Sequence, residues 1–97
     1  MRCFVRKRDA VSAEVDGEVV AFDAARGVCF GLNGTASRIW QLIETPATTK
    51  QICEALLAEF KIDPATCERE ALGLLETLQT EGLVATFLSN RIEAPNA

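Results

Sequence analysis

The residues best suited to chemistry in this 97-residue chain are its cysteines and a group of glutamates. The cysteines are Cys3, Cys29, Cys53 and Cys67. The glutamates of one predicted helix are Glu68, Glu70, Glu76 and Glu81. A thiolate could act as a nucleophile or a metal ligand, and a carboxylate could act as a general acid or base. Both kinds of catalysis draw most often on histidine, and the sequence contains no His and no Tyr.

The spacing of these residues argues against a catalytic or metal site. The cysteines are 26, 24 and 14 positions apart, which matches no zinc motif. Cys53 and Cys67 fall among apolar residues at helical spacing, so we expect them to pack as small core side chains. The glutamates are typical of a solvated helix face. The three glycines of "GVCFGLNG" do not have the spacing of a phosphate-binding loop. The sequence therefore predicts no metal, no cofactor and no enzymatic activity.

Composition indicates one globular domain, with 48% hydrophobic and 25% charged residues. The net charge is −4, although the first eight residues alone carry +4.

We predict a basic flexible N-terminus over residues 1–9, a folded domain over 10–88 and a flexible C-terminal tail over 89–97. The sequence has neither a membrane-length apolar run nor a secretory signal, so we expect a cytoplasmic protein that does not contact a membrane.

The first third of the chain has the pattern of a β-sheet. Apolar residues alternate in "VSAEV" (11–15), and Asp16-Gly17 is a strong signal for a two-residue hairpin. The return strand is "EVVAF" (18–22), and a turn ending at Gly27 leads to "VCFGL" (28–32). This order predicts a three-stranded antiparallel meander, in which Phe30 and Leu32 face the core.

The remainder has helical patterns with recognisable ends. Asn33 is a suitable N-cap for a helix over 34–44, and Thr48 to Gln51 form a capping box for a second helix. Asp63-Pro64 begins a third helix that ends at Gly82, and residues 83–88 follow as an extended tail. The predicted fold class is α+β in the order βββααα, a three-stranded antiparallel sheet followed by three helices. These are the parts of a winged helix-turn-helix.

The strand over 28–32 lacks the features that usually protect a sheet edge. It contains neither proline nor a charged residue. An open edge of this kind can take up an extended peptide as an additional strand, with the third helix beside it. Alternatively, the strand is central in the sheet, is covered by residues 83–88, or pairs edge to edge with a second copy of the chain.

A winged helix-turn-helix could also bind DNA, and charge tests that alternative. The natural recognition helix, over residues 65–82, has a net charge of −3. Phosphate contacts need Lys or Arg on the docking helix, and the basic N-terminus compensates only in part. We therefore expect no nucleic-acid partner.

Three stretches of the sequence resemble the PqqD-like family, also called RiPP recognition elements. They are "VDGEVVAFDAARGVCFGLNGTASRIW", "TTKQICEALLAEFKID" and "CEREALGLLETLQTEGLV". The resemblance covers about residues 10–85 and is strongest within the stand-alone leader-binding proteins of lasso-peptide pathways. It implies a winged helix-turn-helix peptide chaperone that binds the leader of a precursor peptide as a strand. The partner would be a leader peptidase or another maturation enzyme. Relatives that serve radical SAM enzymes share most of the motifs, so that pathway stays an alternative.

Carried onto this chain, the resemblance implies a peptide-binding site on the third strand and the third helix. The third-strand residues are Val28, Cys29, Phe30, Gly31 and Leu32. The third-helix residues are Glu68, Ala71, Leu72, Leu75, Glu76 and Gln79. Leu74 and Leu78 are expected in the core instead.

Overall fold

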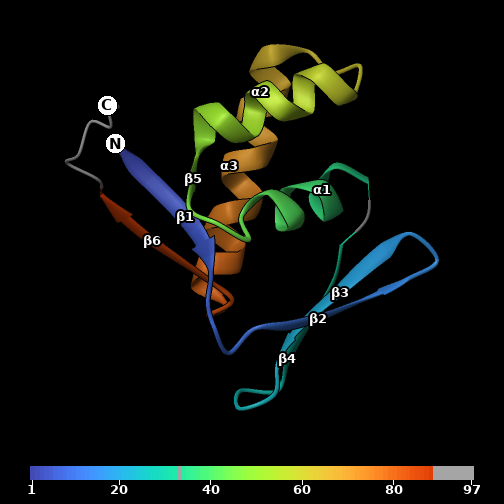
Figure 1. Ribbon diagram of the computed structural model, residues 1–97, viewed down its shortest axis with the longest axis vertical. Coiled ribbons are helices and arrows are strands. Elements are labelled where there is room, and N and C mark those ends of the chain that lie inside the picture. The colour runs from blue at the N-terminus through green and yellow to red at the C-terminus, as the bar shows by residue number, and fades with distance from the viewer. Residues whose placement is uncertain (33, 89–97) are drawn as a thin grey trace.

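The computed structural model describes residues 1–32 and 34–88 (Figure 1). The elements of this part are β1 (Arg2–Arg6), β2 (Val11–Val15), β3 (Glu18–Asp23), β4 (Val28–Leu32), α1 (Gly34–Leu42), β5 (Ala47–Thr48), α2 (Thr49–Glu59), α3 (Pro64–Thr80) and β6 (Val84–Leu88). The predicted α+β class is confirmed. The predicted order of three strands and three helices recurs from β2 to α3, with the short strand β5 inserted before α2.

Strands β2, β3 and β4 form the predicted antiparallel meander, in that spatial order. The turn between β2 and β3 has φ values of 53° at Asp16 and 82° at Gly17. A two-residue hairpin of type I′ requires positive φ at both positions, which explains why Asp-Gly occurs there. The register pairs Val19 of β3 with Leu32 of β4, and both side chains are buried in the core.

A second three-stranded sheet, in the order β5-β1-β6, was not predicted. Strand β1 pairs with β6 from Arg2–Leu88 to Arg6–Val84, and Phe4 at its centre is 0% exposed. The prediction of a flexible N-terminus over residues 1–9 is therefore wrong for residues 2–6. The extended tail predicted over 83–88 contains β6. The predicted tail over 89–97 lies outside the described residues.

The basic residues of β1 take part in this packing. Arg6 Nε donates to the Trp40 carbonyl oxygen at 2.8 Å, and its guanidinium carbon lies 4.9 Å from the centre of the Trp40 ring. Burial lowers the pKa of Arg6, while the charge of Glu44 opposes that shift. Arg2 Nε donates to Thr86 Oγ1 of β6 at 3.0 Å. Two of the four positive charges that suggested a solvated terminus, those of Arg2 and Arg6, therefore contact the elements beside β1.

The helix ends follow the predicted capping chemistry. Thr48 and Gln51 form the predicted capping box of α2, with both reciprocal hydrogen bonds present. Asp63 accepts from the Thr66 backbone N–H at 3.1 Å, and Pro64 occupies the first turn of α3. Helix α1 ends at Leu42, two residues earlier than predicted. The predicted N-cap Asn33 lies outside the described residues.

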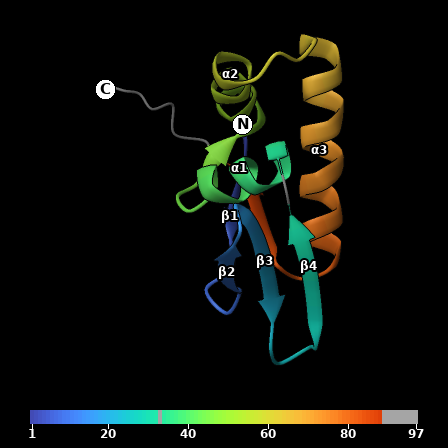
Figure 2. The same ribbon diagram turned by 90° about the vertical axis from the view of Figure 1, so that its right-hand side faces the viewer.

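The hydrophobic core lies where the three helices meet the two sheets (Figures 1 and 2). The core residues that are less than 2% exposed and have the largest side chains are Trp40, Phe4, Ile43, Ile52, Leu56, Leu75, Leu78 and Leu83. They come from β1, from all three helices of the described chain and from the segments that follow α1 and α3. In the same part of the chain, no helix is long and apolar enough to cross a membrane.

Replacing Phe4 by alanine tests whether the N-terminal segment belongs to the folded unit. Phe4→Ala should lower the free energy of unfolding by about 3–5 kcal/mol, because it removes a fully buried aromatic side chain. Arg8→Ala, a change at an exposed position nearby, should change it by less than about 0.5 kcal/mol. Urea denaturation measures both. Equal, small effects of the two changes would mean that residues 1–9 are flexible after all.

Candidate functional site

Strand β4 has an unpaired edge. Within residues 1–32 and 34–88, β4 pairs with β3 alone, and it ends the row β2-β3-β4. Its side chains alternate as predicted: Leu32 is buried and Phe30 half-buried against the core, whereas Cys29 and Gly31 are exposed. The alternatives that β4 is central or covered by residues 83–88 are wrong, because β6 belongs to the other sheet. The outward N–H and C=O groups of β4 remain open to an added strand.

The turn before β4 is tied to the end of α3. The Asp23 carboxylate accepts from the Ala25 backbone N–H at 3.1 Å, and the Asp23 carbonyl accepts from Gly27 at 2.9 Å. Arg26 projects from this turn, and its Nη1 donates to the Glu81 carbonyl oxygen just after α3. The cation therefore satisfies a carbonyl group at the negative end of the helix dipole. This contact fixes one end of the space between β4 and α3.

Gly82 makes that contact possible. Its φ is 84°, in the left-handed region that ends many helices, and a Cβ there would collide with the Arg26 guanidinium. The backbone conformation requires glycine at this position, and a larger residue would also displace the Arg26 guanidinium from its contact with Glu81. The predicted C-terminal role of Gly82 is confirmed, and the contact with Arg26 is an addition to it.

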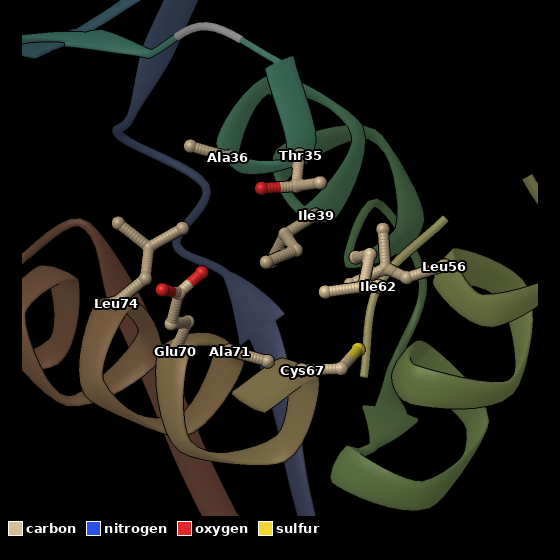
Figure 3. A pocket seen from close by; sticks show the side chains of 9 residues that line it. All are labelled: Thr35, Ala36, Ile39, Leu56, Ile62, Cys67, Glu70, Ala71 and Leu74. Atoms are coloured by element: carbon tan, nitrogen blue, oxygen red, sulfur yellow. The ribbon is translucent and has the colours of Figure 1, made fainter. Parts of the chain in front are cut away.

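A cavity of about 170 Å³ is lined by residues of α1, α2, the turn before α3 and α3. It lies between α1, which follows β4 directly, and α3 (Figure 3). Its lining residues are Thr35, Ala36, Ile39, Leu56, Ile62, Cys67, Glu70, Ala71 and Leu74. Glu70 and Leu74 point from α3 toward α1 in Figure 3. The lining is mostly apolar, with the Glu70 carboxylate as its charged group.

One row of α3 faces α1 and the β3–β4 turn. Glu70 and Leu74 border the cavity beside α1, and the backbone carbonyl of Glu81, the residue that follows α3, accepts from Arg26. Positions 70, 74, 77 and 81 follow one another at helical spacing, so Thr77 lies in the same row. We call Glu70, Leu74, Thr77 and Glu81 the α3 row. In Figure 2, β2, β3 and β4 follow one another from left to right, and α3 stands above β4, with its lower turns just to the right of the upper end of β4.

The six α3 residues that the sequence assigned to the site do not lie together in the structure. Ala71 lies in the wall of the cavity. Leu75 is 0% exposed and offers no surface to a ligand. Glu68 lines a different cavity, between α2 and α3, and Gln79 Oε1 accepts from Arg2 Nη2 at 3.2 Å on the β1 side. The remaining two, half-buried Leu72 and exposed Glu76, border neither cavity.

Two residues of α3 that line the cavity, Glu70 and Leu74, were not among the site residues assigned from the sequence. Leu78 is buried as predicted, but Leu74, also expected in the core, is half-buried and lines the cavity. Helical spacing could have grouped Glu70, Leu74 and Glu81 on one side of α3. It could not have shown which side turns toward β4, because the tie between Arg26 and Glu81 joins residues 55 positions apart.

The cysteines do not form a reactive site in this structure. All four, which lie in the described part of the chain, are free thiols. Burial raises the pKa of Cys53 to about 11, and a hydrogen bond with Cys67 contributes to the increase. Cys53 is therefore protonated at neutral pH and a poor nucleophile. Across the described residues, no cluster of His, Cys, Asp and Glu has the arrangement to hold a metal ion.

The chain belongs to the PqqD family. Residues 18–84, more than half of its length, match the family described as "Coenzyme PQQ synthesis protein D (PqqD)". The family resemblance seen in the sequence motifs is thus confirmed. No curated protein matches the chain.

Two solved structures share the fold. One is TbiB1 in complex with the TbiA(beta) leader peptide, which is 33% identical and covers 88% of this chain and 99% of that chain, with a TM-score of 0.78. The other is a lasso peptide synthetase B1 complexed with the leader peptide. It is 23% identical and covers 84% of this chain and 96% of that chain, with a TM-score of 0.74. At that lower identity the likeness shows the fold alone.

A double-mutant cycle tests the tie between the β3–β4 turn and α3. Gly82→Ala should lower the free energy of unfolding by about 1–2 kcal/mol for the left-handed backbone alone, and by more in the presence of Arg26. In an Arg26→Ala background the same change should cost less, because the guanidinium no longer occupies the space of the new methyl group. Urea denaturation of the four proteins gives the coupling. If the change in the free energy of unfolding of the double variant equals the sum of the two single changes to within about 0.5 kcal/mol, the two residues do not interact.

Proposed function

We propose that this protein binds the N-terminal leader of a ribosomally made precursor peptide by adding it as a strand to the free edge of β4. In this proposal it presents the leader to a leader peptidase or another modifying enzyme, in the cytoplasm, during lasso-peptide biosynthesis. The observation that carries the proposal is the open, uncharged edge of β4 with α3 on its free side. TbiB1, 33% identical over most of its length, was solved with a leader peptide bound.

The energetics of strand addition are sufficient for specific binding. Each backbone hydrogen bond contributes about 0.5–1.5 kcal/mol net, and each apolar side chain that becomes fully buried contributes about 1.5–3 kcal/mol. Ordering a disordered leader costs about 2–5 kcal/mol or more. With several backbone bonds and two or three buried side chains, the upper half of these ranges is compatible with a dissociation constant near or below about 1 μM.

The proposed contacts combine the backbone of Val28–Leu32 with the side of α3 that faces it. On α3 we assign them to Glu70, Leu74 and Thr77 of the α3 row, with Ala71 in the wall of the cavity. The cavity would receive an apolar leader side chain. Glu68 and Gln79, which the sequence also suggested, already contact α2 and β1 and are not included.

We interpret α2, the turn over 60–63 and α3 as a helix-turn-helix, and the β2–β3 hairpin as its wing. The exposed surface of α3 is acidic, with Glu68, Glu70 and Glu76 against Arg69. An acidic helix fits a major groove poorly, which favours a peptide over DNA as the ligand. The protonated Cys53 thiol and the absence of histidine from the sequence favour a binding protein without catalytic activity.

The choice of pathway rests on the relatives. The sequence resemblance to leader-binding proteins of lasso-peptide pathways favours a lasso pathway, and TbiB1, solved with a leader peptide, supports leader binding. A member that serves a radical SAM enzyme would use the same strand edge, so the β4 site does not depend on the pathway.

Fluorescence anisotropy with a labelled synthetic leader tests the proposal directly. The leader would be taken from the precursor peptide encoded beside this chain. We expect saturable binding with a dissociation constant near or below about 1 μM, and no saturable binding of a scrambled leader or of duplex DNA. DNA binding that weakens steeply with salt, without leader binding, would overturn the proposed function.

Two leucines of α3 provide a matched pair for locating the peptide. Leu74→Ala should weaken leader binding by about tenfold, since truncating a buried apolar contact costs roughly 1.5 kcal/mol or more. Leu72→Ala removes the same atoms from another half-buried position of α3 and should leave affinity within about twofold. The same anisotropy titration measures both. A larger loss for Leu72→Ala would place the peptide on the side of α3 that the sequence first suggested.

A further inference from the structure

Four of the six glycines of this chain have positive φ angles, which favour glycine; they are Gly17, Gly27, Gly34 and Gly82. The other two, Gly31 of β4 and Gly73 of α3, are not among the residues with positive φ. Apart from its chain neighbours, a Cβ added at either would meet no atom of the described chain within 4 Å. A glycine inside a strand or helix lowers stability relative to alanine. Neither conformation nor packing therefore accounts for these two glycines.

Gly31 differs from Gly73 in its location. Gly73 lies at an exposed position of α3, and nothing in the structure explains it. Gly31 lies on β4, whose outer edge is unpaired within the described chain. The register between β3 and β4 runs one to one from Asp23–Val28 to Val19–Leu32, so β4 contains no bulge. A glycine inside a regular strand often marks the place where a ligand approaches the backbone closely.

The outer face of the sheet β2-β3-β4, which is the side away from the core, has open space at Gly31. Gly31 is exposed and lies on the face opposite to that of buried Leu32. The register places Gly31 beside Val20 of β3, and Val20 beside Ala13 of β2. A strand added to β4 would continue this row with one residue beside Gly31. Because Gly31 has no side chain, space is open between that residue and Val20.

The width of this space favours an aromatic side chain. Adjacent strands lie about 4.8 Å apart, so an added strand and β3 are about 9.6 Å apart with β4 between them. Residues about 7–8 Å apart across a sheet are within reach of aromatic and other long side chains, whereas short side chains do not meet at that separation. An aromatic ring can also cover the backbone of a glycine on the neighbouring strand.

The residues around Gly31 favour an aromatic ring over a long charged side chain. Val20 lies directly beside Gly31, Phe22 lies diagonally across from it, and Cys29 is next to it on the same face of β4. Val20 and Phe22 are half-buried and offer an apolar surface to a ring. Glu18, on the other diagonal, is exposed. A cationic side chain would turn toward Glu18 in solvent and would leave Gly31 uncovered.

We infer that the leader carries an aromatic residue in register with Gly31, and that its ring lies across Gly31 on the outer face and contacts Val20. This inference rests on the proposed function and deepens it, because Gly31 then determines which class of residue the leader has at one position. The two neighbours of the aromatic residue point to the inner side of the sheet, since side chains alternate along a strand. The ring is therefore a separate contact from the side chain assigned to the cavity beside α1.

Two valine substitutions in one row of the sheet give a matched test. Gly31→Val fills the space that the ring would occupy. Ala13→Val places the same side chain on the same face, but on β2, two strands away from the open edge. Valine favours strands, and a Cβ at Gly31 meets no atom of the described chain. Both variants should therefore unfold at no lower urea concentration than the unaltered protein. Gly31→Ala is the smaller replacement if Gly31→Val is destabilised.

Leader affinity is measured by fluorescence anisotropy with the synthetic leader and with variants in which each aromatic residue in turn is replaced by alanine. One such replacement should weaken binding to the unaltered protein and to Ala13→Val by about tenfold, because the ring contact is lost. Gly31→Val should weaken binding of the unaltered leader by a similar factor. It should bind that alanine leader within about twofold of the unaltered protein, because no ring competes with the valine for space.

Three outcomes would contradict this account. If no aromatic replacement has an effect that depends on residue 31, or if the residue with such an effect is Lys or Arg, the inference is wrong and the proposed function stands. If Gly31→Val weakens binding of every leader equally, the valine disturbs strand pairing itself, and the inference is again wrong. If the unaltered protein binds no leader, the proposed function is overturned instead.

The α-proton resonances of Gly31 provide a second measurement that needs no change in the protein. Protons above the face of an aromatic ring are shielded by its ring current, so these resonances should move upfield on saturation with the leader. They should not do so with the alanine leader. Gly17, in the turn between β2 and β3, serves as a reference that should not shift. Unshifted Gly31 α-protons in a saturated leader complex would overturn the inference.

Discussion

Burial of one stripe of α3 is the interaction on which the rest of the structure depends. Cys67, Ala71, Leu75 and Leu78 are all at most 2% exposed, and they anchor the helix to the core. Since an α-helix has 3.6 residues per turn, fixing that stripe also fixes the direction of every other residue of α3. The α3 row is thereby turned toward α1 and the β3–β4 turn. The same burial that stabilises the fold thus shapes the space beside the free edge of β4.

The two sheets pack against the core in different ways. The sheet β5-β1-β6 continues directly from α3 through Leu83, whose carbonyl accepts from the Lys7 backbone N–H at 3.0 Å, and it closes one side of the core. The sheet β2-β3-β4 packs on the core through the inner side of β3 and β4, so its far strand β2 stays exposed, while Val20 and Phe22 on the outer side of β3 are half-buried. One sheet therefore holds α3 in place. The other offers backbone groups along β4 and apolar side chains on its outer face.

Local signals in the sequence predicted the local structure well. Asp16-Gly17, the Thr48 capping box and Asp63-Pro64 each act within a few residues, so hairpin and helix starts could be predicted without knowing the fold. Strand β1 could not, because its partner β6 lies about 80 residues away and its basic residues are typical of a solvated terminus. The contact between Arg26 and the Glu81 carbonyl, which ties the β3–β4 turn to the end of α3, could not be predicted for the same reason, because it joins residues 55 positions apart. The open edge of β4, by contrast, was predicted from the absence of proline and charge in Val28–Leu32.

The central claim is that a peptide pairs with β4 as an added strand. Amide hydrogen exchange measured by NMR tests this claim most directly. In the protein alone, alternate amides of Val28–Leu32 point away from β3 and should exchange fast, while the others should be protected by the β3 ladder. On saturation with the leader, the fast amides should become protected, and those along the free edges of β2 and β6 should not change. Saturable leader binding that leaves the β4 amides fast, or that protects the β2 or β6 edge instead, would contradict strand addition at β4.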